Sequence, residues 1–112
     1  FRLYMKLTKK TCVPCQGGIP PLTYKEAVGL LGQIPGWILS EAGDKIRRSF
    51  AFRDFSSALE FVNRVGEIAE SENHHPDISF GWGYAELVVY THKIKGLHEN
   101  DFILAAKVTE LV

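Results

Sequence analysis

The sequence predicts a single α+β domain in which two β-hairpins alternate with three helices, in the order α-β-β-α-β-β-α. The chain has 112 residues, the usual size of one domain, and 46% of them are hydrophobic, which is enough to form a core. Apolar residues recur at helical spacing in separate segments, and turn signals divide the stretches between them into pairs of strand-like runs. Hairpins imply an antiparallel sheet, so we expect four antiparallel strands with the helices packed on one face.

The first helix should follow an irregular segment that covers residues 1–22. Thr23 and Glu26 have the spacing of a capping box, in which each residue satisfies a free backbone N–H group of the other. A short helix is therefore expected from there to about Leu31. Pro35-Gly36 should end it and turn the chain.

Each predicted hairpin has a glycine turn between two runs rich in β-branched and aromatic residues. The turns are Gly43-Asp44 and Gly83. The predicted strands are 37–42 and 45–52 in the first hairpin, and 78–82 and 84–92 in the second. Ile46 and Phe50 share one face of their strand, although Arg48 falls on the same face and weakens the register prediction.

The clearest helix lies between the hairpins, and a last helix follows them. Asp54 can cap the first of these, which should end near Asn73 because a residue that precedes proline, as in His74-His75-Pro76, avoids the helical region. Its expected buried face is formed by Phe55, Ala58, Leu59, Val62, Val65, Ile68 and Ala69. The last helix should run from about Glu99 to the C-terminus. Its expected buried residues are Phe102, Ala105, Val108 and Val112.

Composition excludes several classes of protein. Thirteen basic residues balance thirteen acidic ones, so the chain lacks the basic surface that nucleic-acid binding requires. The basic residues are concentrated in the first half and the acidic residues in the second half, an asymmetry that could orient one chain against another. No apolar run approaches the roughly 20 residues that span a bilayer, and the start lacks a signal-peptide core. We therefore expect a cytoplasmic protein whose biological start is Met5, with residues 1–4 a remnant of cloning.

The two cysteines form a single Cys12-Val13-Pro14-Cys15 motif. A zinc site needs four ligands, and the flanking residues predict a loop rather than the strand-to-helix junction of a thioredoxin motif. The favoured interpretation is a reduced, noncatalytic pair in a mobile arm. A disulfide, or a metal shared between two subunits, remains an alternative.

All four histidines lie between positions 74 and 98. His74 and His75 follow a predicted helix, and His92 closes the last predicted strand. If the second hairpin brings these ends together, the imidazoles line one pocket, with Glu70, Asp77 and Asp101 nearby. Imidazole titrates near neutrality, so such a pocket could both donate and accept protons.

Structural roles could also explain several of these residues. His98 stands where the cap of the last helix would be, and Asp101 is stabilised by the free N–H groups of that helix's first turn. Trp37 and Trp82 are more often core anchors than ligand-stacking residues. A second functional interpretation is a hydrolase with three histidine zinc ligands. Adjacent histidines on an extended chain point to opposite sides, however, and the helical spacings that aim two histidines at one ion are absent.

The spacing in the second half of the chain resembles the signature of the pterin-4a-carbinolamine dehydratases. The residues that carry this resemblance are Glu70, His74-His75-Pro76, Trp82, His92 and Asp101, and it continues at Gly36-Trp37, 50–55, Gly96-Leu97 and 102–105. The resemblance covers about residues 17–112, which we expect to form one dehydratase-like domain behind an irregular arm of residues 1–16. The sequence departs from the pattern at Trp82, where many members carry Tyr, and at His98, where Ser or Thr usually caps the helix.

The resemblance implies dehydration of 4a-hydroxytetrahydropterin to quinonoid dihydropterin. That substrate is left by aromatic amino-acid hydroxylases, which would be the functional partners, and tetrahydropterin would be recycled. The family uses no metal or organic cofactor and forms homodimers or homotetramers. Animal members also act as dimerisation cofactors of a homeodomain transcription factor, so a protein-binding or scaffold role is the alternative function.

The resemblance also implies roles for individual residues. His74 and His92 would be the acid/base pair, His75 would chiefly hold the pterin, and Glu70 would orient His74 from one helical turn earlier. The expected substrate-binding set is His74, His75, Pro76, Thr91, His92, Lys93, Ile94, Trp37, Trp82 and Asp101. Within it, backbone groups around Pro76 and residues 91–94 would read the edge of the ring, and a tryptophan could cover its face.

Overall fold

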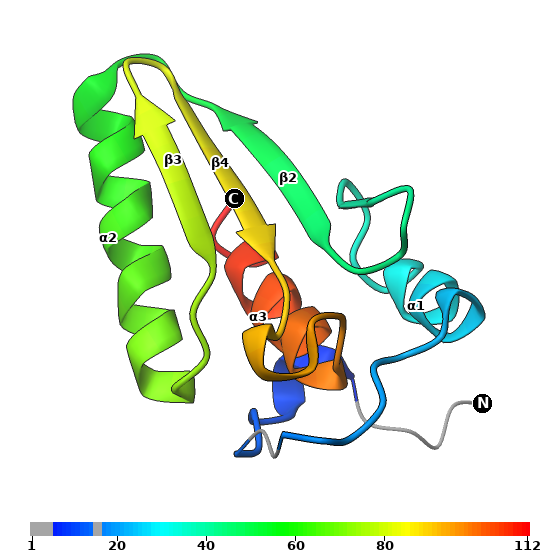
Figure 1. Ribbon diagram of the computed structural model, residues 1–112. Helices are drawn as coiled ribbons and strands as arrows, with labels where there is room; N and C mark the ends of the chain where they lie inside the picture. The colour runs from blue at the N-terminus through cyan, green and yellow to red at the C-terminus, as the bar shows by residue number, and fades with distance from the viewer. Residues whose placement is uncertain (1–5, 15–16) are drawn as a thin grey trace.

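The computed structural model describes residues 6–14 and 17–112 and confirms the predicted α+β fold (Figure 1). The regular elements are α1 (Tyr24–Leu31), β1 (Ile38–Leu39), β2 (Ile46–Ala51), α2 (Phe55–Glu72), β3 (Asp77–Gly81), β4 (Tyr84–Val89) and α3 (Glu99–Thr109). Two 3₁₀ turns, η1 (Leu7–Lys9) and η2 (His92–Ile94), complete the fold. The predicted start at Met5 and the state of Cys15 concern positions outside the described residues.

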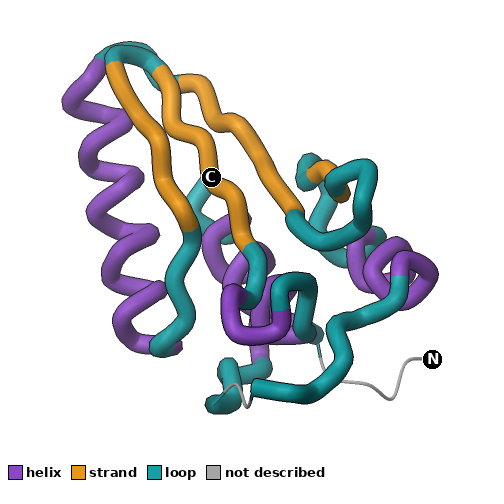
Figure 2. The backbone as a smooth tube through the Cα atoms, viewed as in Figure 1, coloured by secondary structure: helices purple, strands orange, loops and turns teal. Residues whose placement is uncertain are grey.

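The four strands form one antiparallel sheet in the order β1-β2-β4-β3 (Figure 2). In the central pair Ile46 lies opposite Val89 and Phe50 lies opposite Ala85. Side chains alternate between the two faces of a strand. The face that carries these residues is buried against α2 and α3, and the opposite face leaves Arg47 exposed.

Local capping explains where the helices begin. The Thr23–Glu26 capping box is present at the start of α1, and the Asp54 side chain accepts a hydrogen bond from Ser57 N at the start of α2. His98 caps α3 as expected, since its Nδ1 accepts from Asn100 N at 3.0 Å. The predicted starts of all three helices are therefore confirmed.

Two of the predicted strands are shorter than expected. The first was expected over 37–42, but only Ile38 and Leu39 pair with β2. The Trp37 side chain instead enters the core, where its Nε1 donates to Thr109 Oγ1 at 2.8 Å. The last was expected to reach His92, but β4 ends at Val89, and His92 begins the η2 turn.

The expected buried faces of α2 and α3 need correction. Phe61 is 5% exposed and packs against Phe50 and Phe52, although the predicted buried face omitted it. Phe55 and Leu59 were expected in the core but are 45% and 39% exposed. Val112, expected on the buried side of the last helix, lies beyond α3 and is exposed. The buried residues Ala58, Phe61, Val65 and Ala69 follow steps of three and four residues and form one stripe, which is narrower than predicted and leaves Phe55 and Leu59 at its exposed edge.

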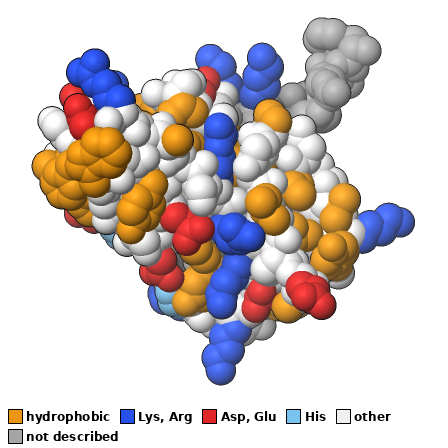
Figure 3. Space-filling model, turned by 90° about the horizontal axis from the view of Figure 1, so that it is seen from above, with side chains coloured by type: hydrophobic (Ala, Val, Ile, Leu, Met, Phe, Trp, Pro, Cys, Tyr) orange, Lys and Arg blue, Asp and Glu red, His pale blue; other side chains and the backbone are white. Residues whose placement is uncertain are grey.

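Part of the remaining surface is apolar. Figure 3 looks onto the end of the molecule that carries the β3–β4 turn, where apolar side chains gather on one side. Trp82 lies in this turn and is 72% exposed, and Tyr84, the first residue of β4, is 50% exposed. Among the residues that the structure describes, no helix is both long and apolar enough to cross a membrane.

Candidate active site

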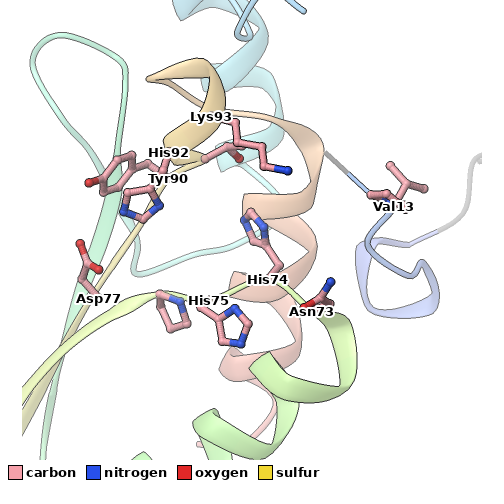
Figure 4. Close-up of a pocket in the computed structure, with 11 residues that line it drawn as sticks. Val13, Asn73, His74, His75, Asp77, Tyr90, His92 and Lys93 are labelled. Atoms are coloured by element: carbon pink, nitrogen blue, oxygen red, sulfur yellow. The ribbon is translucent and has the colours of Figure 1, made fainter. Parts of the chain in front are cut away.

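A pocket of about 350 Å³ lies where α2 ends and β4 leaves the sheet (Figure 4). It joins the three histidines that the sequence singled out, His74, His75 and His92. The other lining residues are Val13, Pro14, Asn73, Pro76, Asp77, Tyr90, Thr91 and Lys93. The predicted convergence of two distant segments on one pocket is therefore observed.

The C-terminus of α2 places His74 and His75. Asn73 adopts a left-handed conformation with φ of 53°, which Asn tolerates better than most residues, and its backbone N–H donates to carbonyls of the last turn. The His74 backbone N–H also bonds back to Ala69 O at 3.1 Å. The chain thus leaves the helix at Asn73 and runs extended through the histidines into β3.

A narrow loop places His92. Thr91 and Gly96 form a two-way backbone bridge, with N–O distances of 2.9 and 3.4 Å, which closes η2 into a tight turn. A Cβ atom at Gly96 would lie 2.6 Å from the Pro21 side chain, so only glycine fits this close approach. The His92 ring packs against the Tyr90 ring, with centroids 4.1 Å apart. The loop therefore holds His92 beside the pocket.

Asp101 supports His74 from behind the pocket. Its Oδ1 lies 2.6 Å from His74 Nε2, and its Oδ2 accepts from Thr91 Oγ1 at 2.8 Å and from His98 N at 2.9 Å. Asp101 is fully buried, and the His74 side chain is only 11% exposed. A carboxylate can only accept hydrogen bonds, so this pairing places the imidazole proton on Nε2 and leaves Nδ1 to exchange a proton with a ligand.

The predicted partner of Glu70 needs correction. Glu70 was expected to orient His74, but its Oε2 lies 2.5 Å from Nε2 of His75. Both side chains of this pair are largely exposed, at 78% for Glu70 and 53% for His75. Solvent screening makes such a pair weak, so Glu70 can help to orient His75 but holds it loosely.

Four residues of the expected substrate-binding set do not line the pocket. Trp37 is buried in the core beside Phe50, and Trp82 lies at the β3–β4 turn, at the other end of the strands. Ile94 in η2 is half-buried outside the lining. Asp101, the fourth, has no exposed surface and reaches the pocket lining through its hydrogen bonds to His74 and Thr91.

Sequence reasoning missed four lining residues, namely Val13, Pro14, Asn73 and Tyr90. Tyr90 could have been found, because it lies two residues before His92 on the same face of the predicted strand 84–92. Tyr90 also makes a cation–π contact, in which the ammonium group of Lys45 lies 5.0 Å from the centroid of its ring. No signal in the sequence places Val13 and Pro14 beside residues some 60 positions later.

The described geometry gives no support to a zinc site. Within residues 6–14 and 17–112, no three His, Cys, Asp or Glu side chains are arranged to hold one metal ion. Burial, reinforced by the charge of Glu72, raises the pKa of the Cys12 thiol to about 12. Metals bind the thiolate, so this environment disfavours Cys12 as a ligand.

The fold and the pocket together define a small α+β protein with a histidine-lined site suited to acid/base chemistry. Residues 20–111 match the model of the pterin 4 alpha carbinolamine dehydratase family, and the chain belongs to that family. It is 60% identical over 107 residues to a relative from Halorhodospira halophila, covering 96% of this chain and 98% of that one. It is 59% identical over 105 residues to a relative from Methylococcus capsulatus, covering 94% and 92%. Both relatives are named as pterin-4-alpha-carbinolamine dehydratases.

Solved structures agree with this assignment. A Brucella melitensis crystal structure, described as a transcriptional coactivator/pterin dehydratase, superposes with a TM-score of 0.77 at 31% identity and covers 81% of this chain and 97% of that one. A pterin dehydratase-like protein identified as a RuBisCO assembly factor of the alpha-carboxysome superposes with a TM-score of 0.59 at 22% identity. This second likeness concerns the fold alone.

Proposed function

We propose that this protein dehydrates 4a-hydroxytetrahydropterin to quinonoid dihydropterin by histidine acid/base catalysis. The observation that supports this most directly is the convergence of His74, His75 and His92 on one pocket, with His74 held by the buried carboxylate of Asp101. The names of the relatives point to the same substrate class.

The reaction needs two proton transfers and no redox change. The C4a–O bond breaks as the hydroxyl group takes a proton and leaves as water. The N5 proton goes to a base as the N5 lone pair forms the C=N bond. Each positioned acid or base contributes about 10²–10⁴-fold in rate.

The geometry suggests how these tasks are divided. His74 is fixed by Asp101 and His92 by its turn and by Tyr90, so these two form the proposed acid/base pair. His75 is more exposed than His74 and pairs with the exposed Glu70, which suits a residue that holds the pterin. Backbone groups around Pro76 and residues 91–93 would read the polar edge of the ring. The proposed context is tetrahydropterin recycling after an aromatic amino-acid hydroxylase, with no metal or organic cofactor.

Stopped-flow measurement of the dehydration of synthetic 4a-hydroxytetrahydropterin tests this proposal. The wild-type protein should accelerate the reaction in the presence of a metal chelator. His74→Ala and His92→Ala should each lower kcat by about 10²-fold or more. His75→Ala should chiefly raise KM.

His98→Asn provides a matched control, because Asn also caps helices and His98 lies outside the pocket lining. It should retain wild-type kinetics. Unchanged turnover in both His74→Ala and His92→Ala would contradict the acid/base assignment. If the chelator abolished the activity of the wild-type protein, the reaction would depend on a metal ion and the proposed mechanism would be wrong.

We further propose that the chain forms a homodimer or homotetramer and that a protein-binding role coexists with catalysis. Exposed Phe55 and Leu59, one turn apart on α2, support an interface on this helix. The description of the Brucella melitensis protein as a transcriptional coactivator favours the same second role. A scaffold would tolerate loss of the histidines, whereas the enzyme would not, so a binding assay with His74→Ala separates the two functions.

A further inference from the structure

The N-terminal arm, here residues 6–14, is fastened to the domain at several points, the first of which is Val13. The side chain of Asn100 accepts from Val13 N at 3.0 Å and donates to Val13 O at 2.7 Å. One carboxamide thus satisfies both backbone groups of Val13, as a neighbouring strand would. Asn100 is 2% exposed, so these bonds are shielded from water.

A second anchor holds the adjacent residue. Glu72, the last residue of α2, accepts from Cys12 N at 2.8 Å through Oε1 and pairs with Lys107 of α3 at 2.6 Å through Oε2. Leu7 is buried beside α3, and Lys10 forms an ion pair with Glu99. The arm is therefore bonded to both helices that frame the pocket.

These anchors bring Val13 and Pro14 to the pocket as an apolar wall. Figure 4 shows Val13 and Asn73 on one side, Asp77 and Tyr90 on the other, and His74 and His75 between them. The rest of the lining is rich in polar groups that can read the edge of a pterin ring. The match to the family model begins at residue 20, so Val13 and Pro14 precede the matched part of the chain.

The chemistry of the substrate indicates what this wall contacts. The reacting atoms C4a and N5 must face the imidazoles, and C6 is bonded directly to N5. A substituent on C6 therefore emerges next to the histidines. Resting on the proposed function, we propose that Val13 and Pro14 form a specificity wall for the C6 substituent, and that Asn100 is the positioning residue that holds this wall.

Two substrates and three variants test the specificity wall. The substrates are 4a-hydroxytetrahydropterins with a dihydroxypropyl group or a methyl group at C6. The quantity measured is the ratio of kcat/KM for the larger substrate to kcat/KM for the smaller one. Val13→Ala removes two methyl groups from a half-exposed side chain. This ratio should fall by about threefold to tenfold in the variant, mainly because KM for the larger substrate rises. Asn100→Leu should change the ratio in the same direction, because it releases the wall without touching the histidines.

Thr11→Ala is the matched control, since Thr11 is exposed on the same arm and does not line the pocket. It should keep the wild-type ratio. A wild-type ratio in Val13→Ala would overturn the specificity wall while leaving the dehydratase intact, and so would an equal loss of kcat on both substrates. If Asn100→Leu does not fold, Val13→Ala decides alone. Inactivity of the wild-type protein on both substrates would instead defeat the proposed function itself.

Discussion

At the scale of single residues, the carboxylate of Asp101 has two tasks. Its Oδ2 accepts from the Thr91 hydroxyl and from the backbone N–H of His98, which joins the end of β4 to the start of α3. Its Oδ1 is then left for His74. The same interactions that begin the last helix therefore fix the orientation of the imidazole of His74, the proposed acid or base.

Replacing Asp101 by Asn tests this coupling. The amide keeps the shape and can still cap α3, but its NH₂ group can face His74 Nε2, which favours the tautomer protonated on Nδ1. We expect Asp101→Asn to lower kcat by about 10²-fold with little change in KM. Single-turnover stopped-flow kinetics would measure the chemical step directly.

Glu70→Gln is the control for Asp101→Asn, because it makes the same carboxylate-to-amide change in the Glu70–His75 pair. Because Glu70 meets His75 on the surface, we expect a rise in KM of about threefold and a retained kcat. A loss of kcat as large as that of Asp101→Asn would show that Glu70 serves His74 after all.

The sequence could identify the histidines but not their partners. The rule that places residues i and i+4 together assumes a continuous helix from Glu70 to His74. The left-handed Asn73 ends the helix one residue too early, and His74 turns inward to Asp101. That partner is 27 residues away along the chain, and only the folded sheet brings the two together.

The environment of Cys12 predicts low thiol reactivity. Burial, then the charge of Glu72, raises the thiol pKa to about 12, against about 8.5 for a free cysteine. At pH 8 very little of the folded protein therefore carries the reactive thiolate. In a Cys15→Ser background, iodoacetamide should modify Cys12 far more slowly in native protein than in urea, as followed by mass spectrometry. Equal rates would show that the arm does not shield this thiol.

At the scale of elements, helices were easier to predict than strands because their signals are local. Capping residues and apolar spacing fix where α1, α2 and α3 begin. The extent of a strand depends on its partner. Residues 37–42 have strand-like composition, but a loop begins at Ser40. Its hydroxyl group accepts hydrogen bonds from Asp44 N and Lys45 N, which closes this loop. β1 is therefore left with two residues.

The C-terminus of α2 depends on the Glu72–Lys107 pair, which joins the arm, α2 and α3. The side chains are 10% and 19% exposed, so the pair is well shielded. We expect Glu72→Gln to lower the free energy of unfolding by about 1–3 kcal/mol at pH 7, since Lys107 loses its counter-charge. Urea denaturation would measure this change, with the exposed Glu67→Gln as a control that stays near zero.

The pH dependence of this effect has a definite sign. Burial alone would raise the pKa of Glu72, but hydrogen bonds from Lys107 and Cys12 N outweigh it, and the net pKa is lowered. A lowered folded-state pKa stabilises the protein above the unfolded value, about 4.3, and the contribution is lost as pH falls through the folded value. The difference between wild type and Glu72→Gln should therefore persist at pH 5–7 and shrink below about pH 4. A difference independent of pH would show that lost packing is the cause.

At the scale of the whole molecule, some basic residues of the first half of the sequence form ion pairs with acidic residues of the second half. Lys10 pairs with Glu99 and Arg47 pairs with Glu86, each a cation of the first half with an anion of the second. Charges paired within one chain are less available to orient a second one. The proposed self-association therefore depends on exposed apolar surface more than on charge.

Phe55 and Leu59 provide the sharpest test of that association. Both lie on one face of α2, and Phe55 also stacks on Phe80 of the edge strand β3, with ring centroids 5.6 Å apart. Burying this face against the same face of a second copy would remove large side chains from water, which is the self-complementary contact of a two-fold dimer. Sedimentation velocity should give wild type a mass two or four times that of the 12.6 kDa chain, and Leu59→Glu should shift it toward the monomer. Val28→Glu places the same charge on an exposed apolar residue of α1 and should leave the mass unchanged. A monomeric wild type would refute self-association, whereas an oligomer that survives Leu59→Glu would place the interface on another surface.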